Sequence, residues 1–140
     1  MAGDDGWRLL DEPGRAAPFD QSLPQLEVRR LGPGVAAARV ATSAGQTNGM
    51  GGLHGGYLAA VAEQSQCLPL YLDGRIDRDG CVTVDFSVKY VAGGVAGIPL
   101  DAEVTCLRET GRLGFISGLI RQNGELVLAF TGTLRKLPRR

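Results

Sequence analysis

The strongest constraint on the fold is one long helical segment set among strand-like segments. Across residues 55–68 nothing breaks a helix, and five residues share one face at helical spacing: Leu58, Val61, Ala62, Ser65 and Leu68. Pro69 would end or kink this helix at the preceding residue. Two members of the stripe, Ala62 and Ser65, are small and would let a sheet approach the helix closely. A lone helix of this kind has to cover the face of a sheet.

Four strand-like segments follow the helix. Apolar and polar residues alternate with a period of two over residues 82–90 and again over 100–106. Two further strands, at residues 113–122 and 125–134, are joined by Asn123-Gly124, a strong signal for a tight β-hairpin. Consecutive strands with short connections pair antiparallel. This half of the chain therefore predicts an antiparallel sheet.

Two more strands precede the helix. The first covers residues 26–31 and ends at the turn Gly32-Pro33-Gly34, and the second covers residues 35–42. The order of two strands, one helix and four strands predicts an α+β fold, in which a curved antiparallel sheet of about six strands wraps around one long central helix. Because one helix covers too little of such a sheet, we expect at least a dimer.

Length fits a single folded domain. The chain has 140 residues, enough to bury a real core. We predict that residues 25–140 form this domain. Residues 1–24, rich in Gly, Pro, Asp and Arg, are predicted to form an N-terminal arm with a short helix around residues 7–10.

Composition excludes several functional classes. The formal net charge at pH 7 is zero, so no overall field draws the chain toward nucleic acid or a membrane. No segment approaches the ~20 apolar residues of a spanning helix, and Asp4 and Asp5 do not resemble a signal peptide. The three cysteines (Cys67, Cys81 and Cys106) match no zinc or redox spacing. We therefore expect no metal, no cofactor and a reducing, cytoplasmic location.

Basic residues gather at the C-terminus: Arg135, Lys136, Arg139 and Arg140. Two interpretations are open. The cluster can be a solvated tail that keeps the last strand soluble, which we favour, or a patch that binds anionic groups such as phosphates.

The most informative stretch is the loop of residues 48–56, Asn-Gly-Met-Gly-Gly-Leu-His-Gly-Gly, which runs directly into the helix. The first N–H groups of a helix lack internal partners and lie at the positive end of its dipole. A glycine at position 55 would let a carbonyl oxygen reach a backbone N–H, which is the geometry of an oxyanion hole. Loop glycines are often only turn residues, but that interpretation leaves unexplained a helix that begins in glycine, where Ser, Thr or Asp caps better.

Three further side chains are candidates for chemistry. Glu63 lies off the core stripe, where a carboxylate is ordinarily solvated. Its position alone does not decide between a solvated and a catalytic carboxylate. His54 could be a base, but directly before the helix we favour a structural role in fixing the loop. Cys67 could pair with His54 as a nucleophile, although a buried thiol is the commoner case in an Ala/Leu-rich helix.

Taken together, the run from Asn48 through His54-Gly55-Gly56 to Glu63 resembles the hotdog-fold acyl-CoA thioesterases, in particular the phenylacetate-pathway and hydroxybenzoyl-CoA thioesterase-like branch. That family shares an Asn or Gln, then His-Gly-Gly, then an Asp or Glu in the following helix, at the spacing found here. The resemblance covers residues 26–136. It implies an acyl-CoA substrate and a homodimer, with a dimer of dimers as the expected larger assembly.

The resemblance also implies roles for individual residues. Gly55 would polarise the thioester carbonyl through its N–H, with Asn48 assisting. Glu63 would be the nucleophile or the base that activates water. Thr83 matches the family's water-positioning hydroxyl in the strand after the helix.

Three other positions are expected at the substrate site by the same resemblance: His54, Gly56 and Cys67. In the branch that uses Glu, a Thr lies one helical turn beyond the carboxylate. Cys67 occupies that position here, which departs from the branch.

Helix geometry favours a site shared between two chains, independently of the family. Gly55 and Glu63 are eight residues apart, so they lie ~12 Å apart along one helix. A reacting carbon must lie within about 3–3.5 Å of the attacking atom. One chain therefore cannot easily join its own Glu63 to a carbonyl held at its own Gly55, whereas two antiparallel copies can.

Two alternatives to a thioesterase are open. The same fold can bind acyl-CoA without cleaving it, although a pure binder has no need of a carboxylate near a thioester. A hotdog hydratase is less favoured, because such sites usually pair an Asp with a His in another arrangement and His54 is the single histidine of the chain.

Overall fold

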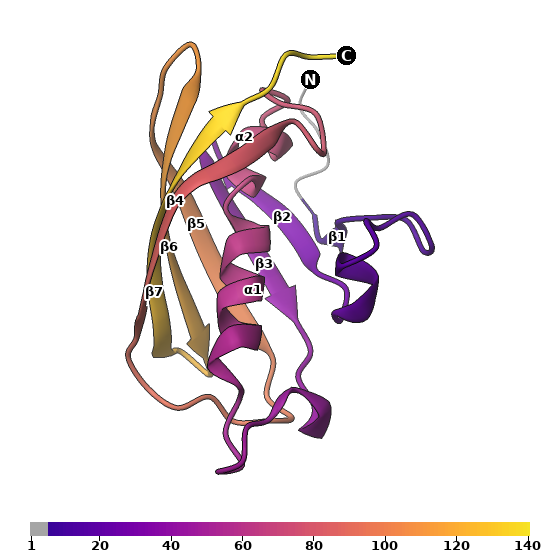
Figure 1. The fold of residues 1–140 in the computed structure, drawn as a ribbon, viewed down its shortest axis with the longest axis vertical. Helices are drawn as coiled ribbons and strands as arrows, with labels where there is room; N and C mark the ends of the chain where they lie inside the picture. The colour runs from indigo at the N-terminus through magenta and orange to yellow at the C-terminus, as the bar shows by residue number, and fades with distance from the viewer. Residues whose placement is uncertain (1–5) are drawn as a thin grey trace.

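A seven-stranded antiparallel sheet curves around one central helix in the computed structural model, which describes residues 6–140 (Figure 1). The strands are β1 (Arg8–Leu9), β2 (Glu27–Gly32), β3 (Val35–Val40), β4 (Cys81–Tyr90), β5 (Leu100–Glu109), β6 (Leu113–Gln122) and β7 (Glu125–Lys136). The helices are α1 (Gly55–Ser65) and α2 (Leu68–Leu72), with short 3-10 turns η1 (Asp20–Ser22) and η2 (Ala44–Gln46).

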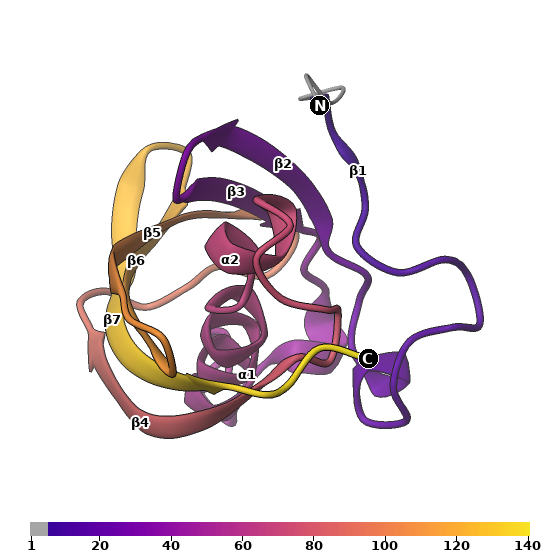
Figure 2. The same ribbon diagram turned by 90° about the horizontal axis from the view of Figure 1, so that it is seen from above.

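The strand order is β1-β2-β3-β5-β6-β7-β4, and all neighbours pair antiparallel. Viewed from above, the sheet encloses α1 on its concave side (Figure 2). The predicted hotdog fold is therefore confirmed. Among residues 6–140, no helix is long and apolar enough to cross a membrane.

The N-terminal arm adds the seventh strand. The short helix predicted around residues 7–10 is wrong, because Arg8 and Leu9 pair with β2 and the Leu10 N–H donates to the Leu26 carbonyl at 2.9 Å. A helix of so few residues is unstable in isolation, whereas the edge of β2 offers ready partners for extended backbone. Residues 1–5 of the predicted arm lie outside the described residues.

The central helix is shorter than predicted. It ends at Ser65, three residues before the predicted end, and α2 begins at Leu68 with Pro69 in its first turn. A proline costs little there, because the first N–H groups of a helix have no internal acceptor. The predicted stripe is nevertheless buried against the sheet: Leu58, Val61, Ala62, Ser65 and Leu68.

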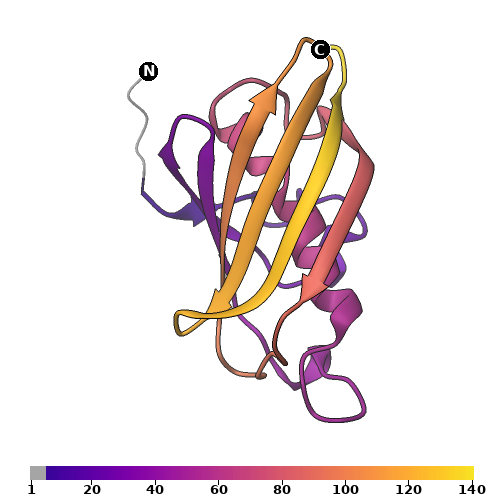
Figure 3. The same ribbon diagram turned by 90° about the vertical axis from the view of Figure 1, so that its left-hand side faces the viewer.

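The predicted hairpin between β6 and β7 is confirmed. Asn123 and Gly124 both have positive φ, at 49° and 81°, as a tight hairpin turn of two left-handed residues requires. Figure 3 looks onto the outer face of the sheet, in which the long strands β5, β6, β7 and β4 lie side by side, with α1 behind them.

Strand β4 forms one edge of the sheet and is largely exposed. Its partner among the described residues is β7, and its other edge has no neighbouring strand. Val84 is 61% exposed and Tyr90 is 54% exposed. The predicted period of two holds from Phe86 to Tyr90, but a bulge between Thr83 and Asp85 shifts the register, so that Thr83 meets Glu63 while Val82 and Val84 are exposed.

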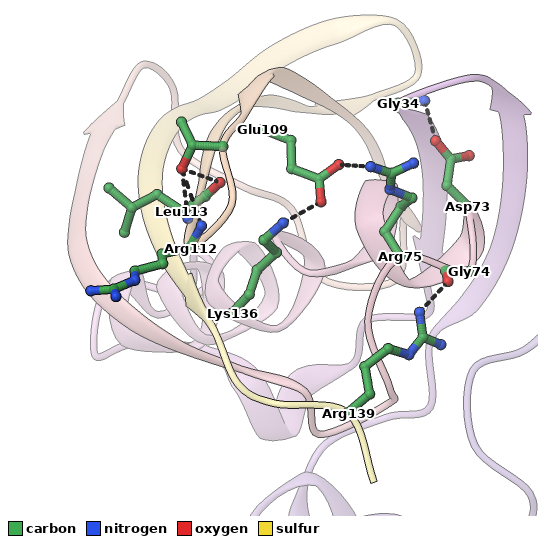
Figure 4. A network of polar contacts seen from close by, with 10 residues as sticks. Gly34, Asp73, Gly74, Arg75, Glu109, Arg112, Leu113, Lys136 and Arg139 are labelled. Atoms are coloured by element: carbon green, nitrogen blue, oxygen red, sulfur yellow. Dashed lines mark hydrogen bonds and ion pairs between the residues drawn. The ribbon is translucent and has the colours of Figure 1, made fainter.

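Part of the C-terminal basic cluster ties the end of β7 to neighbouring segments (Figure 4). Lys136 Nζ donates to Glu109 at 2.5 Å, Arg75 also pairs with Glu109 at 3.0 Å, and Arg139 donates to the Gly74 carbonyl at 2.6 Å. Burial alone would raise the pKa of the Glu109 carboxyl, but Lys136 and Arg75 outweigh burial and hold that pKa below its ordinary value. Neither interpretation of the cluster foresaw this structural role.

Candidate active site

The N-terminal end of α1 presents a free backbone N–H at Gly55. His54 is the N-cap, and its Nδ1 accepts a hydrogen bond from the Gly56 N–H at 2.8 Å. His54 therefore has a structural role, as we favoured, and it caps the first turn of the helix. The Gly56 N–H is thereby occupied, whereas the Gly55 N–H meets no acceptor within the described part of the chain. Gly55 has a helical backbone and is not one of the positive-φ glycines.

Tyr90 covers Gly55 and was missed by sequence reasoning. Its hydroxyl donates to the Gly55 carbonyl at 2.8 Å, and a Cβ at position 55 would lie 3.3 Å from the Tyr90 ring. Glycine at this position therefore also allows the close approach of an aromatic ring. Tyr90 was visible in the sequence only as the last apolar member of the β4 pattern.

Asn48 uses its amide oxygen, and not its amide nitrogen, for contacts within the loop. Its Oδ1 accepts hydrogen bonds from the N–H groups of Met50 at 2.9 Å and Gly52 at 3.2 Å. The side-chain NH₂ is left for an outside acceptor such as a carbonyl oxygen. Asn48, Gly55 and Tyr90 line one open depression with a volume of about 360 Å³.

Glu63 and Thr83 meet at the other end of α1. The Thr83 hydroxyl donates to Glu63 Oε1 at 3.0 Å, and it accepts a hydrogen bond from Gln66 Nε2 at 2.7 Å. Both Glu63 and Thr83 are exposed to solvent. Gln66 was not singled out from the sequence, because its contact with a distant strand leaves no local signal.

A second depression, also of about 360 Å³, surrounds Glu63 and Thr83. Arg78 lines it and is held by two hydrogen bonds to the carboxylate of Asp11, at 2.9 and 3.0 Å. Asp20 of the N-terminal arm also lines it. The arm therefore contributes to the wall of the Glu63 depression.

Cys67 lines the same depression but is not suited to nucleophilic attack. Burial raises the pKa of its thiol to about 12, so the thiol stays protonated at neutral pH. His54 caps the opposite end of α1 and cannot activate it within one chain. The possibility of a Cys–His nucleophile therefore finds no support in this geometry.

Each chain thus holds two candidate half-sites at opposite ends of one helix. The half-site near the start of α1 contains Asn48 and Gly55, with His54 as its cap, and the other contains Glu63 and Thr83. The two half-sites are not brought together within one chain. No cluster of His, Cys, Asp and Glu suited to a metal occurs in the described residues.

Comparison with known proteins gives consistent relatives. The family model of the acyl-CoA thioesterase N-terminal domain matches residues 42–135. The solved TT0310 protein of Thermus thermophilus is 28% identical over 87% of this chain and 99% of its own, with a TM-score of 0.74. A mutant form of the phenylacetic acid degradation protein PaaI from the same organism is 27% identical over 86% of this chain and 100% of its own, with a TM-score of 0.73.

A hypothetical thioesterase from Streptococcus pneumoniae, solved with coenzyme A, has the same fold. It is 22% identical over 87% of this chain and 94% of its own, with a TM-score of 0.77. A comparison with curated proteins found no match. The segment matched by the family model covers more than half of the chain and includes α1, β4 and both half-sites. The chain therefore belongs to the acyl-CoA thioesterase family and is a thioesterase with the hotdog fold.

Proposed function

We propose that two antiparallel copies of this chain together hydrolyse acyl-CoA thioesters. In each composite site one copy supplies Gly55 and Asn48, and the second copy supplies Glu63 and Thr83. A homodimer has two such sites. A dimer of dimers is a further prediction that this scheme allows but does not need.

The observation that carries the proposal is the separation of the two half-sites. Gly55 and Glu63 line different depressions and lie ~12 Å apart along one helix, too far for one carbonyl to meet both. The edge strand β4 and the helix α1 both contribute residues to the lining of each depression. An antiparallel copy at this edge would bring its Glu63 toward the Gly55 of the first.

The chemistry follows from the groups present. The Gly55 N–H and the Asn48 amide would donate to the thioester carbonyl and stabilise the negative charge that develops on its oxygen. Glu63, acting as a base, would take a proton from a water held by Thr83 as that water attacks the carbonyl carbon. The carbon–sulfur bond then breaks, and CoA leaves as a thiolate that takes up a proton. Glu63 could instead attack the carbonyl itself and form an anhydride that water hydrolyses.

The test is an assay of free thiol released from phenylacetyl-, hydroxybenzoyl-, short and medium aliphatic CoA esters. Glu63→Gln should lower kcat at least ~10²-fold on the best substrate, because the base or nucleophile is lost. Glu103→Gln on the outer side of β5 is a matched control and should keep full activity. If Glu63→Gln retained most of its turnover, the proposal would fail and the non-catalytic binding module would be favoured.

A single turnover in ¹⁸O-labelled water separates the two roles of Glu63. A base leaves the Glu63 carboxylate unlabelled, whereas hydrolysis of an anhydride can place label in it.

A further inference from the structure

We propose that Gln66 is a positioning residue that points the hydroxyl proton of Thr83 at Glu63. This inference rests on the proposed function, since it concerns how the Glu63 half-site is held ready for catalysis. Gln66 does not itself contact the substrate in this scheme, because only 1% of its surface is exposed.

The direction of the hydrogen bonds sets the position of that proton. A threonine hydroxyl has one proton and can also accept. Gln66 Nε2 donates to Thr83 Oγ1 at 2.7 Å, so the hydroxyl is an acceptor on that side. Its proton is therefore left for Glu63 Oε1, at 3.0 Å. Without the amide, the exposed hydroxyl could rotate and donate to solvent.

If Gln66 only filled space in the core, its polar side chain would cost free energy compared with an apolar one. Its side chain is buried between α1 and the sheet, and its Oε1 has no hydrogen-bond donor within the described residues. Burying an unpaired polar atom costs free energy, so an apolar residue of similar size would stabilise the core better. The buried amide therefore indicates a role beyond packing.

Strand β7 makes room for this amide. Gly132 pairs with Phe86 of β4, and a Cβ built on Gly132 would overlap the Gln66 Oε1 atom. The absence of a side chain at Gly132 is therefore what lets the amide lie where it reaches Thr83. Gln66 directly follows α1, Gly132 lies in β7 and Thr83 lies in β4, so the arrangement joins the end of the helix to two neighbouring strands.

The experiment compares Gln66→Met, Thr83→Val and the double variant. Gln66→Met should lower kcat about three- to tenfold, the effect of one lost hydrogen bond, and leave KM within about twofold. Thr83→Val should lower kcat by about tenfold or more, since Glu63 then loses its donor. The double variant should be no worse than Thr83→Val, because Gln66 acts through the hydroxyl that is already gone.

Ser65→Ala is the matched control. Its buried hydroxyl bonds only within α1, to the Val61 carbonyl at 2.6 Å, so kcat should not change. Gly132→Ala is the second route if Gln66→Met folds poorly. The new methyl group at position 132 should displace the Gln66 amide and reproduce the loss of kcat. In the Thr83→Val background it should cause no further loss.

Three results would overturn the inference. In the first, Gln66→Met, or Gly132→Ala in its place, keeps the wild-type kcat. In the second, the loss is as large in the Thr83→Val background as in the wild type, which indicates a general structural role. In the third, Glu63→Gln, measured in parallel, retains its turnover, and the proposed function then fails together with this inference. An inactive Glu63→Gln beside an unaffected Gln66→Met rejects the role of Gln66 alone.

Discussion

The two ends of α1 are built by different means. At the first end the backbone provides the functional group: a free N–H at Gly55, with His54 capping the next N–H and Tyr90 lying against the glycine. At the other end side chains provide it, through hydrogen bonds from Gln66 to Thr83 and from Thr83 to Glu63. The first arrangement suits polarising a carbonyl and the second suits handling a proton. This difference supports the proposal that each chain holds two unlike halves of one reaction.

The largest effect on the backbone half should come from Gly55→Ala. A methyl group there would lie between the N–H and an incoming carbonyl, so kcat should fall ~10²–10³-fold, as for a lost oxyanion donor. The melting temperature should change little, because the backbone is helical and the exposed Tyr90 ring needs to move only slightly.

Melting temperature and kcat measured on one preparation decide this prediction. Gly49→Ala, in the same loop and with open space around the new methyl group, is the control and should stay active. An unstable Gly55→Ala protein whose activity falls only with its folded fraction would show that the glycine serves packing against Tyr90.

Asn48→Asp should have a smaller effect at the same end, about ten- to 10²-fold on kcat. One carboxylate oxygen can still accept from Met50 and Gly52, so the loop should keep its shape and the melting temperature should hold. The other oxygen replaces the NH₂ and repels the carbonyl oxygen. Asn48→Ala, which also loses the loop contacts, should lower stability as well. Equal kcat values for Asn48→Asp and wild type would remove Asn48 from the site.

The smallest effect on turnover should come from Glu109→Gln, since Glu109 lines neither depression. It should leave kcat unchanged and lower the free energy of unfolding by about 1–2 kcal/mol at pH 7, through loss of the contacts with Lys136 and Arg75. Because the pKa of Glu109 is lowered in the folded state, this stabilisation is present above the ordinary value of 4.5. It is lost as the pH falls through the folded pKa. Denaturant unfolding from pH 7 to pH 3 should show the two proteins converging.

Local patterns in the sequence predicted most of the fold. The buried stripe of α1, the alternation in β5 and the Asn123-Gly124 hairpin depend on neighbours a few residues apart, which periodicity and turn chemistry detect. The short strand β1 escaped prediction because it exists through pairing with the edge of β2. The early end of α1 escaped it because Pro69 is accommodated at the start of a second helix.

The candidate site divides in the same way. Glycine at a helix start is a local feature, so Gly55 could be selected from the sequence, whereas the position of Glu63 did not decide its role and the resemblance to a known family assigned it. The resemblance to a known family selected Thr83, and its hydroxyl does lie against Glu63. Gln66 and Tyr90 depend on approaches across the fold, to β4 and to Gly55, that leave no trace in the local pattern.

Subunit complementation tests the central claim, that one site needs both ends of α1 from two different chains. Glu63→Ala and Gly55→Val proteins should each be inactive. After mixing, unfolding and refolding together, a heterodimer regains one intact site, formed by the Gly55 of one chain and the Glu63 of the other. At equal amounts the activity should recover to about a quarter of wild type, since about half the dimers are mixed and each has one working site of two. Heterodimers demonstrated by differential tagging but showing no recovery of thiol release would mean that each chain forms its site alone.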